Sequence, residues 1–470
     1  MIHCYTILFV RMAVMTEKKL GIAEKLGYGG HHLASNMVVF FVNSYFMFYL
    51  TDVYGIPPAI AGAIFAIGVV WDGINDPLIA HFADNRRFKS GECTRPFMLY
   101  TCLPLAVSTV LLFTPFEMPL IMKVIYCIVI YIIFDTATTF YRLPGFVMPV
   151  IASADQRDRL SINAYVSGGG SLGGALATVM CWPLVIMFSK GTDSIGKLIN
   201  PQRGFPVTSV IIGGILIVLA LYSYFTARER IKPKLDADDK LSLFKSFKLT
   251  IQDYNFRWNT VFSTIYFICN TLMVTMVVYY STWVLKDAAT NIIIMAVFIT
   301  GSITALPFVK KVSIKLGRRK AMMLGALLIL AGKIPFVIFP SIAMVMYVNA
   351  FITGLSVALN IVSFSTTRAE VADNIEAVSG RRIDGMVVNF NGFFNKCGTS
   401  LTTLAIGLVL QFAGYDAGLS QQPPQVTTAI VGIMGWAAIA FAILMFFCAR
   451  KITIEDVVKK LNNGDKVINA

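Results

Sequence analysis

Long apolar stretches recur along almost the whole chain, and short polar segments separate them. A helix of about twenty apolar residues crosses the hydrocarbon core of a bilayer, so stretches of this length predict transmembrane helices. Twelve stretches are long enough, and they cover roughly residues 33–53, 58–82, 97–113, 118–147, 162–188, 206–227, 259–285, 291–309, 321–339, 342–366, 386–412 and 429–449. The pattern therefore predicts an all-α membrane protein with twelve transmembrane helices.

The longest polar connection, residues 228–257, divides the predicted spans into two groups of six. The expected parts of the chain are a lead (1–27), a six-helix bundle (28–227), the central loop (228–257), a second six-helix bundle (258–449) and a tail (450–470). Basic loops stand at equivalent places in the two halves, at 84–89 and 315–320. This arrangement is typical of the major facilitator fold, in which two six-helix halves rock around a site at the middle of the membrane.

Charged residues indicate how the chain is oriented in the membrane. Most of the 40 Lys and Arg lie in the lead, in the loops after even-numbered spans and in the tail. By the positive-inside rule, both termini are expected in the cytoplasm, with the protein in the cell inner (plasma) membrane. The net charge of +14 is spread over these loops and forms no single soluble patch, so no nucleic-acid partner is expected.

A polar motif, Trp71 to Pro77, interrupts the second predicted span. An ionised carboxylate buried in oil is costly, so Asp72 and Asp76 need a cation, a proton or a basic partner. Residues i, i+3 and i+4 share a helix face, which lets Asp72, Asn75 and Asp76 direct side-chain oxygens at one spot. Oxygen ligands suit Na⁺, and carboxylates that can take up a proton suit H⁺. The structural alternative is that the two acids only pair with bases on other helices.

Few other charged residues lie deep inside the predicted spans, and they are Asp135, Arg142, Lys333 and Lys396. In the fourth span, Thr138, Thr139 and Arg142 follow Asp135 by three, four and seven positions, so all four residues lie on one stripe of the helix. Asp135 and Arg142 either neutralise each other or leave Arg142 free to face a cavity.

Lys396 belongs to a polar patch in the eleventh predicted span. A lysine deep in a span usually faces a cavity or an acid, so we expect it near Asp72 and Asp76.

The chain shows no pattern typical of an enzyme. It contains no nucleophile–base constellation, no phosphate-binding loop and no metal-ligand cluster, so neither a catalytic site nor a cofactor is expected. The eight cysteines are scattered and never have the pair spacing of a metal site.

Several motifs are distributed over nearly the whole chain. They are Lys25-Leu26-Gly27-Tyr28-Gly29 with Tyr49-Leu50-Thr51-Asp52, the motif at 71–77, Arg95-Pro96-Phe97, and residues 370–376 before the eleventh span. Together they resemble the glycoside-pentoside-hexuronide:cation symporter family. The resemblance implies Na⁺- or H⁺-coupled import of a sugar derivative across a bacterial inner membrane.

The resemblance also implies roles for individual residues. Asp72, Asn75 and Asp76 match the cation-site positions of the family, and Thr138 matches the threonine that completes this site. Lys396 matches a lysine that lies near the site and is expected to couple cation and substrate.

On the sugar side, the chain departs from the galactoside-transporting members of the family. Asn36 and Tyr141 stand where those members have carboxylates that bind galactosyl hydroxyls. The loss of two acids and the presence of Arg142 make the pocket less negative, which favours a hexuronide or another acidic glycoside over the alternative of a neutral pentoside or xyloside. The expected substrate contacts are Asn36, Tyr141, Arg142, Tyr165 and Asn391.

Two other functions remain open from the sequence. Related Na⁺-coupled lysolipid carriers share the fold and a similar cation motif. A transporter-like membrane sensor would also be consistent with a twelve-span chain.

Overall fold

A computed structural model describes residues 21–85, 88, 92, 94–152, 156–192, 198–228, 243–379, 384–419 and 421–454. Over these residues, twelve helices are long and apolar enough to cross a membrane, which confirms the predicted all-α class and number of spans. The first half contains α2 (Ile22–Phe48), α3 (Pro58–Asn85), α4 (Arg95–Leu112), α5 (Leu120–Ile151), α6 (Gln156–Phe188) and α7 (Pro201–Thr226).

The second half repeats this arrangement of six spans. It contains α9 (Tyr254–Tyr279), α10 (Thr290–Leu316), α11 (Arg318–Ile338), α12 (Ala343–Ser379), α13 (Asp384–Phe412) and a last span made of α14 (Pro424–Val431) and α15 (Ala438–Lys451). Short π-helical segments extend α2 and α9 and join α14 to α15, and they are η1 (Tyr49–Val53), η3 (Tyr280–Val284) and η4 (Gly432–Ala437).

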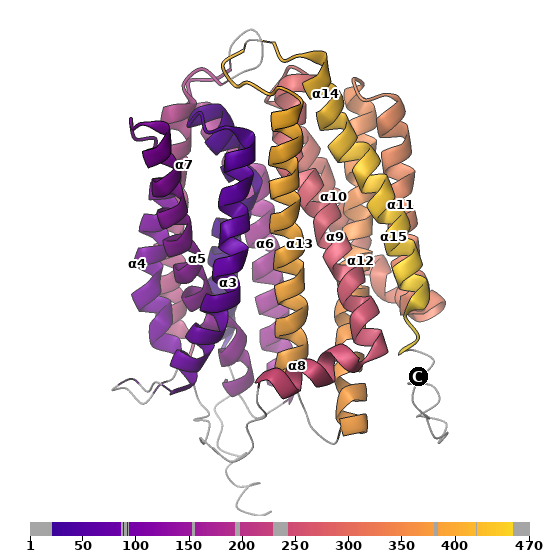
Figure 1. Ribbon diagram of the computed structural model, residues 1–470. Coiled ribbons are helices and arrows are strands. Elements are labelled where there is room, and N and C mark those ends of the chain that lie inside the picture. The colour runs from indigo at the N-terminus through magenta and orange to yellow at the C-terminus, as the bar shows by residue number, and fades with distance from the viewer. Residues whose placement is uncertain are drawn as a thin grey trace, which may run out of the picture.

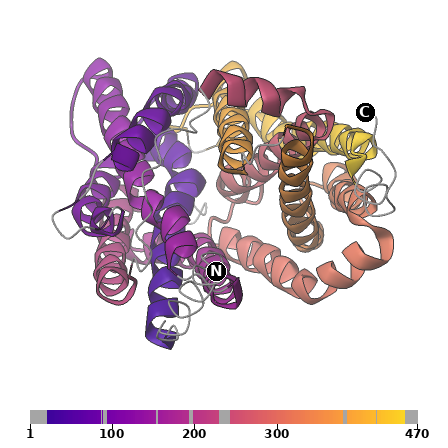
Figure 2. The ribbon, with the colours of Figure 1, turned by 90° about the horizontal axis from the view of Figure 1, so that it is seen from below.

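The two halves lie side by side, with α3 of the first half packed along α13 of the second (Figure 1). The view from below shows the helices of each half as a separate group (Figure 2). An even number of spans returns the chain to the side on which it began, so Gly21 and Ile454 lie at one end of the bundle. We call this the terminal end and the opposite end, which carries the start of α14, the distal end.

The helices extend beyond the spans predicted from hydropathy. α2 begins at Ile22, inside the predicted lead, because its first turns pack closely on α6 at Gly29 and on α7 at Gly27. The Tyr28 hydroxyl also donates to the carbonyl of Arg228 at 2.8 Å. A short helix, α8 (Leu243–Gln252), lies within the segment predicted as the central loop, and Phe247 packs against Phe390 of α13. Residues 1–20, 229–242 and 455–470 of the predicted lead, loop and tail lie outside the described residues.

Glycines on α6 allow it to pack closely on α2. A Cβ added at Gly169 would lie 2.0 Å from the carbonyl oxygen of Gly29, and one at Gly173 would lie 2.2 Å from that of Leu33. Side chains at either position would force the backbones apart, so this contact between two spans depends on small residues.

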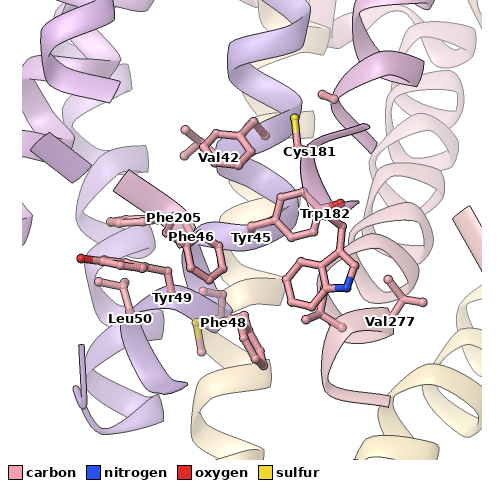
Figure 3. Packing of buried hydrophobic residues seen from close by; sticks show 14 of the residues in the cluster. Val42, Tyr45, Phe46, Phe48, Tyr49, Leu50, Cys181, Trp182, Phe205 and Val277 are labelled. Atoms are coloured by element: carbon pink, nitrogen blue, oxygen red, sulfur yellow. The ribbon is translucent and has the colours of Figure 1, made fainter. Parts of the chain in front are cut away.

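A cluster of aromatic side chains joins the two halves toward the distal end (Figure 3). Tyr45 of α2 stacks on Trp182 of α6 with ring centroids 5.3 Å apart, and Val277 of α9 lies beside them. The Trp182 indole donates to the carbonyl of Ala288 in the second half at 2.7 Å. Phe48 meets Tyr279 of α9 edge to face at 5.4 Å. These contacts exclude water between the halves because the side chains are buried and interlocked.

A hydrogen-bond network centred on Asp52 adds to this distal contact. The Tyr415 hydroxyl donates to Oδ1 of Asp52 at 2.5 Å, and Thr51 donates to Oδ2 at 2.7 Å. The hydroxyl groups of Thr51 and Tyr279 are also 2.7 Å apart, and the Trp283 indole donates to the Tyr415 hydroxyl at 3.0 Å. One carboxylate of the first half is therefore held by groups of the second, which closes the distal end in this conformation.

Gly169→Ala should destabilise the protein. Its methyl group would overlap a backbone oxygen, and overpacking of this kind costs about 1–3 kcal/mol. Gly168→Ala is the matched control, because a Cβ there meets nothing within 4 Å and alanine favours the helix. Thermal unfolding in detergent should give a lower melting temperature for the first variant only. Equal melting temperatures for the two variants would contradict the close packing of α2 on α6.

Tyr415→Phe should open the distal end more often. It removes a hydrogen bond to a charged acceptor, which contributes about 1.5–3 kcal/mol and corresponds to roughly a tenfold or larger shift between conformations. The reporter is Val277→Cys, since Val277 is buried at the contact between the halves. A membrane-impermeant maleimide should label this cysteine faster in the double variant than in Val277→Cys alone. Equal labelling rates in two equally stable proteins would show that Tyr415 does not hold the distal end closed.

Candidate cation and substrate site

One ammonium group bridges the two acids of the 71–77 motif. Lys396 Nζ of α13 lies 2.9 Å from Oδ1 of Asp72 and 2.9 Å from Oδ2 of Asp76, both on α3. The two carboxylates reach a single nitrogen because residues four apart lie on one helix face. The side chain of Asp72 is 10% exposed and that of Asp76 is 42% exposed, so one acid is enclosed and the other is accessible.

Close packing of α3 on α13 brings the acids and the lysine together. A Cβ added at Gly407 would lie 2.2 Å from the carbonyl oxygen of Pro58, and one at Gly62 would lie 2.8 Å from the Cα of Leu404. Glycines on the facing surfaces allow this approach two to three turns from the ion pair. The salt bridge therefore spans the boundary between the two halves of the protein.

A third acid, Asp135 of α5, completes the charged cluster. It lies close enough to Asp72 and Lys396 to interact with both, and its Oδ2 is buried without a hydrogen-bond partner. Arg142, two turns further along α5, interacts electrostatically with Asp76, Asp135 and Asp72, in decreasing order. Asp135 and Arg142 thus share one charged network with the acids of α3. The sequence left open whether Arg142 neutralises Asp135 or is free to face a cavity, and the observed network is intermediate between these alternatives.

The hydroxyl groups of α5 differ in their contacts. Thr139 donates to Oδ1 of Asp76 at 3.1 Å, whereas the hydroxyl of Thr138 donates to the carbonyl of Phe134 at 2.8 Å. Of these two threonines, Thr139 therefore donates to an acid of α3 and Thr138 does not. The family resemblance implies this role for Thr138, one residue earlier. Asn75 is buried and its Nδ2 has no hydrogen-bond partner.

The expected substrate residues of the first half lie along α2, α5 and α6. Asn36 donates from Nδ2 to the carbonyl of Gly170 at 3.1 Å. Tyr141 is fully buried, its ring lies 4.4 Å from that of His31, and its hydroxyl has no hydrogen-bond partner. Tyr165 is half-buried on α6. In this conformation, Tyr165 is thus more accessible to a solute than Tyr141.

Asn391 belongs to a polar network inside the second half. Its Nδ2 donates to Thr260 at 3.2 Å and to Ser263 at 2.9 Å, both on α9. Its Oδ1 accepts from Asn395 at 3.2 Å and from Arg368 Nη1 at 3.2 Å. Both polar atoms of Asn391 are engaged, so the residue holds Arg368 rather than presenting a free amide. Sequence reasoning did not select Arg368, because hydropathy placed it in a loop after the tenth span.

Comparison with known proteins agrees with the fold. The model of the MFS/sugar transport protein family matches residues 27–456. The chain is 25% identical to the inner membrane symporter YicJ of Escherichia coli (strain K12), over 89% of each chain. It is 26% identical to the isoprimeverose transporter of Lactiplantibacillus pentosus, over 92% of this chain and 90% of the relative.

Among solved structures, the fold is similar to that of a bacterial homologue of the human lysosomal transporter Spinster, crystallised in an inward-facing and unoccupied conformation. The TM-score is 0.64 at 16% identity, and the alignment covers 96% of this chain and 98% of that one. The likeness establishes a shared fold.

Lys396→Met should make the protein respond more strongly to cations. The substitution leaves Asp72 and Asp76 facing each other without the bridging base, which destabilises them unless a cation or proton replaces the ammonium. Melting temperatures in NaCl, in choline chloride of equal ionic strength and at lower pH provide the measurement. We expect Na⁺ or acid to stabilise the variant more than the wild type. A variant whose stability responds to neither would contradict a cation site at these carboxylates.

Proposed function

The chain belongs to the MFS/sugar transport protein family, and from this premise we propose that it is a cation-coupled symporter that imports a sugar derivative by alternating access. The relatives include a protein named as a symporter and one named as an isoprimeverose transporter. The substrate class that fits the chain is a glycoside, pentoside or hexuronide.

The observation that supports cation coupling best is the Lys396 bridge between Asp72 and Asp76. A monovalent cation bound by the two carboxylates would take the place that the ammonium fills in this conformation. Na⁺ binds through carboxylate oxygens, and H⁺ binds by neutralising one of them. Either ion would compete with Lys396 for the same oxygens.

The charges of the residues around this site bear on how many cations it binds. Asp72, Asp76 and Asp135 contribute three negative charges when ionised, and Arg142 and Lys396 contribute two positive charges. A net charge of minus one deep in a bilayer protein is costly, and one bound Na⁺ or H⁺ removes it. With all three acids ionised, the cluster would therefore bind one monovalent cation.

Coupling follows from the position of the salt bridge. Because Lys396 lies on α13 and both acids lie on α3, a cation that displaces the lysine releases a contact between the halves. Substrate binding by Asn36, Arg142 and Tyr165 would then act on the same equilibrium between conformations. By linkage, the cation raises the affinity for substrate by the factor by which substrate raises the affinity for the cation.

The direction of transport rests on the distribution of basic residues. The positive-inside rule favours a cytoplasmic location for the terminal end, in which case the closed distal contact around Asp52 and Trp182 would face outward. The described conformation then corresponds to the state that exchanges ligands with the cytoplasm. Import requires that this distal contact open while the halves close at the terminal end.

Asp72→Asn and Asp76→Asn should each abolish accumulation against a gradient while leaving some downhill exchange. The cation site loses charge, whereas the substrate pocket keeps its shape. Uptake of radiolabelled glycosides into proteoliposomes, with and without an imposed Na⁺ or H⁺ gradient, measures both activities. Asp416→Asn, the same change at an exposed acid of the distal end, is the control.

The same assay separates the other candidate functions. Gradient-driven uptake of lysophosphatidylcholine but of no sugar would identify a lysolipid carrier, and no uptake of either would leave a sensor. Full accumulation of a glycoside by both Asp variants would remove the cation site from Asp72 and Asp76.

A further inference from the structure

Arg368 of α12 lies inside the second half without an acidic partner. Its side chain is half-buried, and its Nη1 donates to the amide oxygen of Asn391 at 3.2 Å. No carboxylate among the described residues pairs with it. Its charge is therefore available to an anion that arrives from outside the protein.

A network of neutral groups fixes the position of this guanidinium. Asn391 accepts from Arg368 and is itself held by Thr260 and Ser263 of α9. Asn395 donates to Asn391 and accepts from Ser263 at 3.0 Å. Amide and hydroxyl groups orient a cation without neutralising it, which leaves its charge available to a ligand.

The guanidinium also has donors to spare. Arginine has five N–H donors, and the described contacts use one of them. None of its nitrogens is both sealed from solvent and unpaired, so the remaining donors are open to a solute. A planar fork of this kind binds carboxylates through two parallel hydrogen bonds.

Two other arginines show how Arg368 differs. Arg318 forms a salt bridge with Glu370, only two residues from Arg368 on α12. Arg142 interacts with all three acids of the cation site. Their charges are already balanced within the protein, whereas that of Arg368 is not.

We propose that Arg368, held by Asn391, binds a carboxylate group of the transported sugar derivative. This inference rests on the proposed symport function and makes the substrate a hexuronide-type acid. It also moves the anion-binding role from Arg142, the candidate favoured by the sequence, to the second half. Asn391 acts as a positioning residue, since both of its polar atoms are occupied.

α13 carries both the residue that positions Arg368 and the lysine of the cation site. Asn391 precedes Lys396 by five residues on α13, a separation of about 7.5 Å along the helix axis. The two side chains point about 140° apart around this helix, Asn391 toward α9 and Lys396 toward α3, so the proposed anion site and the cation site lie on different faces of α13. One cation would balance the charge of the acid cluster, and one anionic sugar would balance the charge of Arg368.

The test compares methyl β-D-glucuronide with methyl β-D-glucoside, which differ in having a carboxylate or a hydroxymethyl group at C5. Affinities are measured on purified full-length protein by ligand-dependent melting and by competition for uptake in proteoliposomes. Arg368→Gln should weaken binding of the glucuronide roughly tenfold or more and leave the glucoside within about twofold. Arg450→Gln, the same change at an exposed arginine of α15, should alter neither affinity.

Arg368→Lys keeps the proposal testable if the glutamine variant does not fold. Lysine retains the charge but loses the planar fork, so it should weaken glucuronide binding less than glutamine does and spare the glucoside. A wild type that binds the glucoside in preference to the glucuronide, or that binds no uronide, would overturn the inference. So would an Arg368 variant that folds and binds the glucuronide with unchanged affinity, or one that loses both sugars equally.

Failure of the inference can be told apart from failure of the proposed function. If cation-driven accumulation of the glucoside persists while no uronide binds, symport stands and the role of Arg368 falls. If no sugar accumulates under any cation gradient, the symport function on which the inference rests falls with it. Charge movement gives an independent readout, because co-transport of one cation with one glucuronide should be electroneutral and should produce no steady current.

Discussion

The contact between the Lys396 ammonium and two carboxylates on α3 is the interaction on which the rest of the arrangement depends. Charged groups deep in a membrane protein must be paired, and here the pairing partners belong to different halves. Any ion that replaces the ammonium changes both the local charge and the contact between α3 and α13. Under the proposed function, ion occupancy and conformation would therefore be linked through this one site, without a relay of intermediate residues.

Two contacts between the halves differ in what they respond to. The distal contact combines stacked aromatic rings with hydrogen bonds around Asp52, and its strength depends on packing and on the exclusion of water. The central contact is ionic and lies where a transported cation would bind. A cation bound at the proposed site would weaken the central contact directly, whereas the distal contact would set how strongly the closed distal end is favoured before any ligand binds. With these tasks separated, a small ion would control a large rearrangement without having to break an apolar interface itself.

Hydropathy predicted the spans, and helical periodicity predicted that Asp72 and Asp76 share a face. The cost of burying these acids also predicted a basic partner on another helix. Finer features depend on tertiary packing that a single sequence does not display. Whether Thr138 or Thr139 contacts Asp76 is decided by a rotation of about 100° per residue around α5, which packing fixes. Arg368 was assigned to a loop because averaging over a window ends a span where polar residues begin, although α12 continues to Ser379. Helix ends that project beyond the apolar segment are thus the places where hydropathy is least informative and where a binding group can be overlooked.

The distribution of charge between the halves offers a physical basis for coupling. The acids of the charged cluster, Asp72, Asp76 and Asp135, lie in the first half. Arg368 lies in the second half without a carboxylate partner among the described residues. A cation and an anionic sugar bound on the order of 10 Å apart would attract each other by about 2 kcal/mol at an effective dielectric constant of about 20. Coupling free energies between ligands are typically about 1–3 kcal/mol, so direct attraction is of the size required. A neutral sugar would lack this term and would have to be coupled through the conformational change alone, which is why the charge of the substrate bears on the mechanism as well as on specificity.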